Sequence, residues 1–346
     1  MRARIGFDHY TIGHRDLTSG ETLEFARSHG LDGVQFLEPS VIHQGLDPAR
    51  LADFRRRADS LGLYLEIGLP SPNPVRRVRT EGRDVSAAEH AEDLARHVRA
   101  ASALGCPHAR VYFGDRHDRF RADTPWPDQV AASVDVLRRL TPLLKDLGLK
   151  VGIETHADLT VSELLGVLDR LDPAIAGVTL DTGNLAMRLD DPVRAVEQLA
   201  PWVVSTHIKD CVLETTPRGL RWQARPVGSG ILPMPDLLAP LLRANPSMNL
   251  SIELHPRIYD LPIHDPTWLA YFPEMRAESL ACVTRLAALS EARFASGFLD
   301  RPEVVEAIPW ADRDLDWLAS SLGYLRSVVR ALARLNPPPA SGAHPA

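Results

Sequence analysis

Cysteine is scarce in this chain, and its three copies stand far apart, at Cys106, Cys211 and Cys282. This spacing excludes the disulfide framework of small secreted proteins and a zinc site made of closely spaced thiolates. The first ten residues, MRARIGFDHY, lack the apolar core of a signal peptide, and no apolar run approaches the ~18 residues of a membrane-spanning helix. These absences predict a cytoplasmic protein without a membrane partner.

An excess of basic residues is also missing. The 346 residues include 39 Lys and Arg against 45 Asp and Glu, a formal net charge of −6. Proteins that bind nucleic acid carry a basic footprint for the phosphates, so this charge argues against a nucleic-acid partner. The length, with 45% hydrophobic residues, suits one large globular domain such as an α/β barrel, or two ordinary domains.

Short β-branched runs alternate with longer segments whose apolar residues recur at helical spacing. We predict eight strands, over residues 3–10, 33–38, 63–69, 109–114, 150–156, 177–184, 203–210 and 249–255. Several helical segments between them finish in a helix-ending glycine, at Gly30, Gly62, Gly105 and Gly148. Eight strand–helix units in series predict a (β/α)8 TIM barrel. A doubly wound sheet is the alternative, but no GxGxxG turn follows the first strand.

Two segments fall outside this repeat. The stretch 255–275 follows the eighth strand and is rich in proline and aromatic residues. Its length is typical of a lid or an interaction loop, and we expect it to form a contact in a homo- or hetero-oligomer. The domain prediction is a barrel over residues 1–294, a helical extension over 295–335 and a disordered tail over 336–346.

Four polar side chains stand near the ends of the fifth to eighth predicted strands: Glu154, Asp181, His207 and Glu253. Residues i and i+2 of a strand face the same side. The residues two positions before these four are all small, namely Gly152, Thr179, Ser205 and Ser251. The opposite faces are apolar and would pack on helices. Because barrel enzymes build their active sites at the C-terminal ends of the strands, we expect the four side chains to converge there.

Three carboxylates and one imidazole brought together in this way would be costly to bury without a compensating cation. The oxygen-rich set suits one divalent ion that keeps positions open for water or substrate. We predict Mn²⁺ first, with Mg²⁺, Co²⁺ and Zn²⁺ as alternatives. The competing interpretation is a rim of independent salt bridges, which would have to arise in register on four neighbouring strands.

A second polar set follows two residues further on, at His156, Lys209 and His255. In a continuing strand, His156 would point the same way as Glu154. It is then either a general base, because imidazole titrates near neutrality, or a residue that orients Glu154. His255 is a candidate for binding substrate, with a merely structural role as its alternative.

Three further candidates for substrate binding are less well defined. Lys209 would bind a substrate oxyanion or carboxylate, or else form a rim salt bridge with Asp210 or Glu214. Arg225 precedes a glycine-containing turn and would clamp a hydroxyl, carboxylate or phosphate, unless it is only solvated. His9 stands at the end of the first predicted strand, in GFDHY.

Five short motifs occur in order along the chain: IETH, LDTGN, STHIKD, RPVGSG and SIELH. Together they resemble the xylose isomerase-like TIM barrels of the sugar isomerase and epimerase branch, over about residues 3–294. The resemblance implies that the four strand-end residues bind the metal and that Glu154 and Glu253 act as acid and base. It extends to barrel nucleases of the endonuclease IV type, whose Asp motif continues to a histidine. Asn184 stands in that place here, which argues against a multinuclear zinc centre and nuclease activity.

A metal that chelates a carbonyl oxygen and a neighbouring hydroxyl acidifies the hydrogen on the carbon next to the carbonyl. With the resemblance, this predicts a sugar isomerase or epimerase that enolises a keto sugar by proton abstraction. The resemblance also implies alternatives, lyases acting on 3-oxo sugars: the catalytic subunit of a C-glycoside deglycosidase, or a 3-oxo sugar acid decarboxylase. Trp268, Tyr271 and Phe272 would then line an aglycone pocket or a subunit interface, unless they pack as core. A barrel that is only a binding module is the non-enzymatic alternative.

Overall fold

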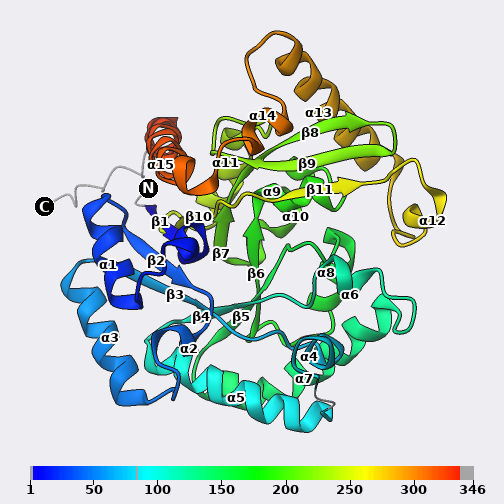
Figure 1. The fold of residues 1–346 in the computed structure, drawn as a ribbon. Helices are drawn as coiled ribbons and strands as arrows, with labels where there is room; N and C mark the ends of the chain where they lie inside the picture. Colours follow the sequence, from blue (N-terminus) through cyan, green and yellow to red (C-terminus); the bar gives the residue numbers. More distant parts are fainter. Residues whose placement is uncertain (1–2, 83–84, 336–346) are drawn as a thin grey trace, which may run out of the picture.

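The computed structural model describes residues 3–82 and 85–335, and its centre is a closed barrel of eight parallel strands (Figure 1). Round the barrel the order is β1, β10, β7, β6, β5, β4, β3, β2. The strands are β1 Arg4–Asp8, β2 Gly33–Phe36, β3 Tyr64–Gly68, β4 His108–Val111, β5 Lys150–Glu154, β6 Ala176–Asp181, β7 Val203–Ile208 and β10 Asn249–Ile252. The eight predicted strands and the TIM barrel are confirmed. The strands end earlier than predicted, so His156 and His255 lie on loops and not within strands.

Helices cover the outside of the barrel. The longer ones before the last barrel strand are α1 Ser19–Ser28, α3 Pro48–Ser60, α5 Ala87–Ala103, α7 Trp126–Asp146, α8 Val161–Leu168, α10 Pro192–Leu199 and α11 Met234–Ala244. The shorter ones in the same part are η1 His9–Arg15, α2 Pro39–Ile42, α4 Pro74–Glu81, α6 Arg116–Arg119, α9 Thr182–Met187 and η2 Ala200–Trp202. Reciprocal capping boxes begin α1, α5 and α8. The four glycines predicted to end helices have φ between 62° and 73°, the left-handed conformation that glycine adopts without strain.

Small inward-facing side chains form a layer beneath the strand ends. Thr179 Oγ1 lies 2.7 Å from Ser205 Oγ, and the Tyr64 hydroxyl lies 2.9 Å from Ser251 Oγ. Ser251 also donates a hydrogen bond to Glu66, at 3.1 Å. Tyr64 and Glu66 come from β3, are buried, and occupy the space that the small residues leave. A packed polar layer therefore supports the strand-end side chains from inside the barrel.

Gly33 makes room for this layer, and Gly33→Ala is expected to destabilise the protein by about 1–3 kcal/mol, the usual cost of overpacking a filled interior. A Cβ at this position would lie 2.2 Å from Cγ of Tyr64. Urea denaturation measures the effect. The matched control is Gly166→Ala in α8, where a Cβ meets nothing within 4 Å and where alanine favours the helix by about 0.5–1 kcal/mol. Equal midpoints for the Gly33 variant and the wild type would contradict the prediction.

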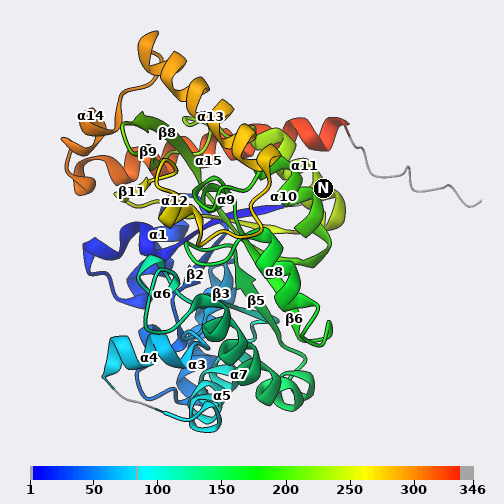
Figure 2. The same cartoon turned by 90° about the vertical axis from the view of Figure 1, so that its right-hand side faces the viewer.

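A three-stranded antiparallel sheet, which the sequence analysis did not predict, follows β7. Its strands are β8 Asp210–Thr216, β9 Gly219–Arg225 and β11 Ile258–Leu261, in the order β11, β9, β8. The predicted long loop 255–275 therefore contains β11, together with α12 Pro266–Leu269. Helix α13 Ala277–Ala295 packs along β8, and Figure 2 shows this accessory sheet and α13 on one side of the barrel.

The C-terminal segment is helical, with α14 Pro302–Glu306 and α15 Trp310–Leu335. Helix α15 packs against β1, β10 and α11. The domain boundary at residue 294 stays a prediction, and the predicted tail 336–346 lies outside the described residues. Within the two described ranges, no helix is both long enough and apolar enough to cross a bilayer.

Candidate metal centre

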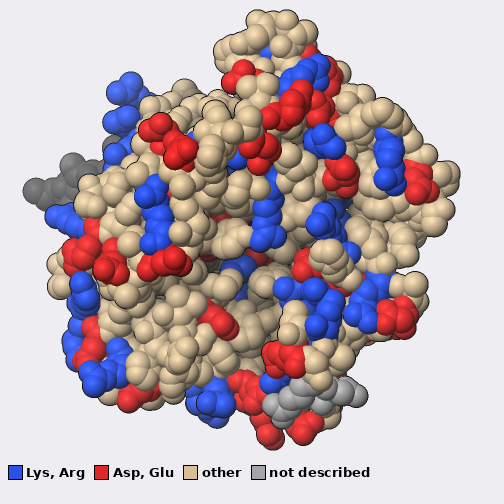
Figure 3. Space-filling model, in the orientation of Figure 1, with Lys and Arg blue, Asp and Glu red and all other residues tan. Residues whose placement is uncertain are grey.

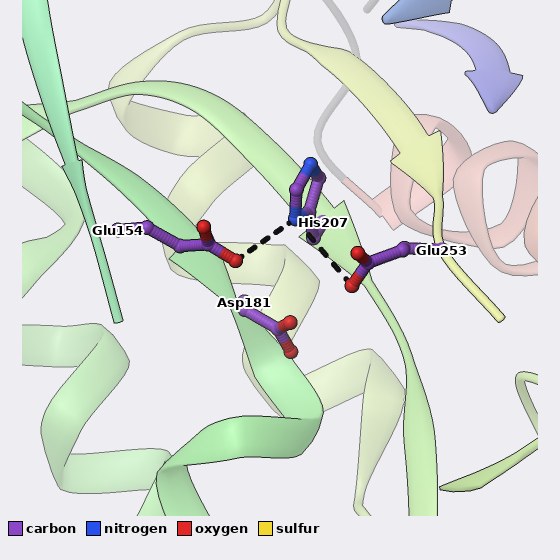
Figure 4. A group of neighbouring side chains, drawn as sticks. All are labelled: Glu154, Asp181, His207 and Glu253. Atoms are coloured by element: carbon purple, nitrogen blue, oxygen red, sulfur yellow. Dashed lines mark hydrogen bonds and ion pairs between the residues drawn. The ribbon is translucent and has the colours of Figure 1, made fainter. Parts of the chain in front are cut away.

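The four strand-end side chains converge at one point (Figure 4). Glu154, Asp181, His207 and Glu253 each offer one ligand atom, and these atoms all lie within 4.8 Å of one another. Three of the side chains are fully buried, and that of Glu253 is 13% exposed. Protein oxygens and nitrogens bind divalent ions at roughly 2.0–2.6 Å, so this spacing leaves room for one ion between them.

The turn after β6 holds Asp181 in place. Asp181 is the N-cap of α9, and its Oδ1 accepts the backbone N–H groups of Gly183 and Asn184 at 2.9 and 3.1 Å. The side-chain amide of Asn184 donates to Oδ2 at 2.7 Å. Asn184, which stands where barrel nucleases carry a histidine, therefore orients the carboxylate of Asp181.

His207 lies among carboxylates on both sides of its ring. Nδ1 is 3.1 Å from Glu154 Oε1 and 3.5 Å from Glu253 Oε2. Nε2 is 3.3 Å from Asp8 Oδ2 and also contacts the side-chain oxygen of Gln35. Burial alone would lower the pKa of His207, but the charges of Glu253 and Glu154 raise it well above its ordinary value. Without a bound metal, these carboxylates therefore favour the protonated imidazole.

Two buried cations neutralise part of the carboxylate charge. Arg110 Nη1 lies 2.8 Å from Glu154 Oε2, and Lys209 Nζ lies 2.9 Å from Asp181 Oδ2 and also contacts Glu253. Burial would raise the pKa of both glutamates, but Arg110 beside Glu154 and Lys209 beside Glu253 hold each pKa below its usual range. Both glutamates are therefore ionised and available as ligands.

The charge balance of the cluster tests whether a cation fits. Its carboxylates are Asp8, Glu154, Asp181 and Glu253. Its fixed cations are Arg110 and Lys209. With His207 neutral, as a metal-bound imidazole must be, the cluster holds two more negative than positive charges. One divalent ion balances this excess, which would otherwise be costly to bury. The residues therefore fit one divalent ion.

The raised pKa of His207 predicts that metal affinity falls with falling pH. A proton on this imidazole competes with the ion, so below the pKa the affinity for Mn²⁺ should fall about tenfold for each pH unit. Calorimetric titration between about pH 8 and pH 6 measures the slope. Repeating it in two buffers that differ in ionisation enthalpy counts the proton released on binding. An affinity that does not change with pH, with no proton released, would contradict this prediction.

His156 lies on the loop after β5, with its ring held by two contacts. Its Nδ1 is 2.9 Å from the carbonyl oxygen of Gly114. Because a carbonyl oxygen only accepts, Nδ1 carries a proton, and in the neutral ring Nε2 is the nitrogen with the free lone pair. The ring of Tyr112 lies against it, with centroids 4.7 Å apart. The orientation and the tautomer of His156 are therefore fixed by its surroundings.

Lys209 and His255 contact each other beside the cluster, with Lys209 Nζ 3.1 Å from His255 Nε2. Burial and the charge of Lys209 hold the pKa of His255 well below its ordinary value, so a neutral ring accepts this hydrogen bond. Lys209 thus has three partners within the site. The alternative prediction, that Lys209 forms a salt bridge with Asp210 or Glu214, is wrong. Asp210 instead accepts four backbone N–H groups, and Glu214 pairs with Arg301 at 3.0 Å.

Two other candidates have their hydrogen-bond partners outside the four ligand residues. Arg225 donates a hydrogen bond to the carbonyl oxygen of Asp300, at 2.7 Å, and so contacts the C-terminal segment. His9 accepts the N–H of Leu37 at 3.2 Å. Its neighbour Asp8, the last residue of β1, reaches His207 in its place.

Three residues contact the cluster although none of them was predicted from the sequence: Asp8, Gln35 and Arg110. A signal was available for the first of them. Gly6 and Asp8 show the same alternation of a small and then a polar inward residue that identified the four strand-end residues.

The aromatic residues of the segment 255–275 pack together. The Trp268 and Phe272 rings are 4.7 Å apart, and Tyr271 meets Phe120 edge-on at 5.1 Å. These contacts agree with the core-packing alternative for Phe272, which is buried. Trp268 also lines a cavity of about 580 Å³. An oligomer contact through this segment stays a prediction.

Comparison with known proteins places this site in a family. A family model described as the xylose isomerase-like TIM barrel matches residues 23–270, more than half of the chain. A 3-oxo-isoapionate decarboxylase from Pectobacterium atrosepticum is 29% identical over 188 residues, which cover 54% of this chain and 59% of that protein. The uncharacterized protein YihM from Escherichia coli is 25% identical over 227 residues, 66% of this chain and 61% of that protein.

The chain therefore spans about three fifths of the length of these curated relatives. Among solved structures, that of an L-ribulose 3-epimerase matches with a TM-score of 0.61 and 19% identity, covering 99% of this chain and 100% of that one. At such identity the likeness concerns the fold. The extent of the family match and the barrel with its strand-end cluster lead to one conclusion: this chain belongs to the xylose isomerase-like TIM barrel family.

Proposed function

We propose that this protein is a divalent-metal-dependent sugar isomerase or epimerase, which enolises a keto sugar by removing the proton α to the carbonyl. The observation that carries the proposal is the convergence of three carboxylates and one imidazole at the C-terminal ends of adjacent barrel strands. The oxygen-rich donor set favours Mn²⁺, ahead of Mg²⁺, Co²⁺ and Zn²⁺. When bound there, such an ion polarises a substrate carbonyl as a Lewis acid.

His156 is the base in this proposal. Because Nδ1–H donates to Gly114, Nε2 is the ring nitrogen left to accept a proton. A fixed imidazole with one free nitrogen can take a proton from carbon and return it on the same face to a neighbouring carbon, whereas return to the other face needs a second acid. The contact with Tyr112 keeps the ring from turning away. The position next to strand β5 brings this nitrogen to the C-terminal face, where the substrate would lie.

The two glutamates have different surroundings and therefore different proposed roles. Arg110 holds Glu154 as a buried carboxylate, which suits a permanent ligand. Glu253 keeps 13% of its side chain exposed, so it is better placed to exchange a proton with a substrate as the second acid/base group. The ammonium of Lys209 and the neutral ring of His255 are proposed to stabilise the negative charge that develops on a substrate oxygen.

Elemental analysis together with a solvent-deuterium exchange assay tests the proposal. We expect about one divalent ion per chain and metal-dependent incorporation of deuterium next to the carbonyl of a free keto sugar, such as D-fructose. Exchange on 3-oxo sugars and 3-oxo-C-glycosides is measured in parallel. A wild-type protein that binds no divalent ion, and supports no exchange on any of the three classes, would overturn the proposal.

A lyase acting on 3-oxo sugars is the second candidate function. The similarity to a 3-oxo-isoapionate decarboxylase favours it, because loss of CO₂ from a 3-oxo acid also leaves an enolate that needs the same stabilisation. The products separate the candidates. Release of CO₂ from a 3-oxo sugar acid, or of an aromatic aglycone from a 3-oxo-C-glycoside, would identify a lyase, and exchange without cleavage would identify an isomerase or epimerase.

A further inference from the structure

A cavity of about 580 Å³ lies close to the metal cluster, walled by segments that follow barrel strands at their C-terminal ends. One wall includes Ala157, the residue after His156, and another includes Tyr259 of β11. The Tyr259 ring lies 5.6 Å from the ring of Trp222, which lies 5.9 Å from that of His255. The wall of the cavity therefore adjoins residues that stand beside the cluster, namely His156 through Ala157 and His255 through Tyr259 and Trp222.

The wall of this cavity is strongly basic, although the whole chain carries a net charge of −6. Four arginines line it, Arg116, Arg188, Arg218 and Arg221, against one acidic residue, Asp260, which pairs with Arg221 at 2.9 Å. The lining therefore carries three more positive than negative charges. Figure 3 shows Lys and Arg side chains gathered to the right of a hollow near the middle of the face of Figure 1. Such a concave basic surface concentrates anions.

Arg188 is the most unusual of these arginines. It is 4% exposed, and its Nε and Nη1 have no hydrogen-bond partner among the described residues. It also lines a second cavity of about 490 Å³ and lies over the ring of Phe272. Burial and the nearby charge of Arg119 lower the pKa of Arg188 to about 9. Glu163, one acidic neighbour, forms its ion pair with Arg119 instead.

The acidic residues Asp158, Glu163 and Asp190 favour the charge of Arg188. Its buried Nε and Nη1 still cost free energy, because these N–H groups lose their hydrogen bonds to water and gain none from the described residues. An anion supplied from solution would satisfy these N–H groups, and the planar fork of arginine matches the two oxygens of a carboxylate or phosphate. The cavity is also larger than such a group requires, which leaves space for the carbon chain that links it to the cluster.

We propose that this cavity binds an anionic group of the substrate, a carboxylate or a phosphate, and that Arg188 is the residue that recognises it. The inference rests on the proposed function in one respect: the remainder of the substrate is the keto sugar that binds at the metal cluster. The substrate is thus an acidic sugar derivative whose charge lies at a distance from its reacting carbonyl.

Calorimetric titration of the full chain, loaded with Mn²⁺, tests this with three probes: sorbitol, gluconate and sorbitol 6-phosphate. At least one of the two anions should bind at least about tenfold more tightly than sorbitol, as expected for a charge-assisted pair. Arg188→Met should remove that advantage. Arg139→Met is the matched control, because Arg139 is an exposed arginine that pairs with Asp135 on α7, and it should retain the advantage.

Folding of the variant is checked by thermal denaturation. Because Arg188→Met replaces an unpartnered buried charge by an apolar chain of similar length, its melting temperature should equal or exceed that of the wild type. Arg188→Lys, which keeps the charge, should keep part of the preference for anions. Equal affinity of the wild type for all three probes, or an undiminished preference in Arg188→Met, would overturn the proposal.

Repeating the titrations after removal of the metal with EDTA separates this inference from the proposed function. A preference for anions that survives in the metal-free protein and depends on Arg188 supports the cavity as an anion site, even if no sugar exchanges deuterium. A preference that requires Mn²⁺ and persists in Arg188→Met means that the probe binds the metal, which would refute the role of Arg188.

Discussion

Asp181→Asn is expected to lower the metal content from about one ion per chain to less than about a tenth of an ion per chain. Deuterium exchange should then slow by a factor on the order of 10³ or more, because the bound ion is the proposed Lewis acid. The asparagine keeps the shape of the side chain and an oxygen that can cap α9. It removes one of the negative charges that balance the ion and leaves the Lys209 ammonium beside a neutral amide. Because the variant loses both a negative charge and a carboxylate ligand of the ion, we expect it to show the largest loss of metal and of exchange among single substitutions in this site.

Metal content of the Asp181 variant is measured by elemental analysis after gel filtration, and exchange is followed by NMR. Asp314→Asn is the matched control, because Asp314 is also a buried aspartate that pairs with a cation, Arg15 at 2.6 Å, but on α15. The control should keep its metal and its exchange rate. If Asp181→Asn binds Mn²⁺ as tightly as the wild type, the cluster is not the metal site.

His156→Gln is expected to slow exchange by about 10²–10⁴-fold, the usual contribution of a general base. Metal content should not change, because His156 is not among the four ligand residues. Glutamine can still donate a hydrogen bond to the carbonyl oxygen of Gly114, but it cannot accept a proton at neutral pH. The combination of a full metal site with lost exchange distinguishes a base from a residue that merely orients a ligand.

The control for His156 is His90→Gln. His90 also lies in the interior with a ring nitrogen, Nε2, against a carbonyl oxygen, that of Ser71 at 2.8 Å, but it belongs to α5. That variant should exchange at the wild-type rate once correctly folded. Wild-type exchange in His156→Gln would contradict the assignment and leave Glu253 as the base.

The barrel and its four converging side chains were predictable because the signal is local. Each barrel strand alternates an inward and an outward residue, so one strand read alone shows which side chains point inward. Applied to the first strand, the same rule favours Asp8 over His9, since Gly6 and Asp8 share a face. His9 was predicted from its place at the end of the first predicted strand, in GFDHY, whereas β1 ends at Asp8.

The accessory sheet and the position of Arg225 were not predictable in the same way. Strand β11 pairs with β9 across more than thirty residues of sequence, and nothing in either strand alone specifies that partner. Arg225 contacts Asp300, which belongs to a segment that follows the whole barrel. Lys209 is an intermediate case: its place after β7 could be predicted, but its three partners come from the end of β6 and from the segment after β10, and they depend on how the barrel closes.

The position of Lys209 has a consequence for how this protein matures. Small zinc domains stay unfolded until their metal arrives, because metal binding supplies most of their folding free energy. Here an ammonium from the chain itself stands between Asp181 and Glu253, so the barrel can close before any ion is captured. A cell short of the divalent ion would then hold a folded, metal-free pool of this protein. Renewed supply would activate that pool without new synthesis or refolding.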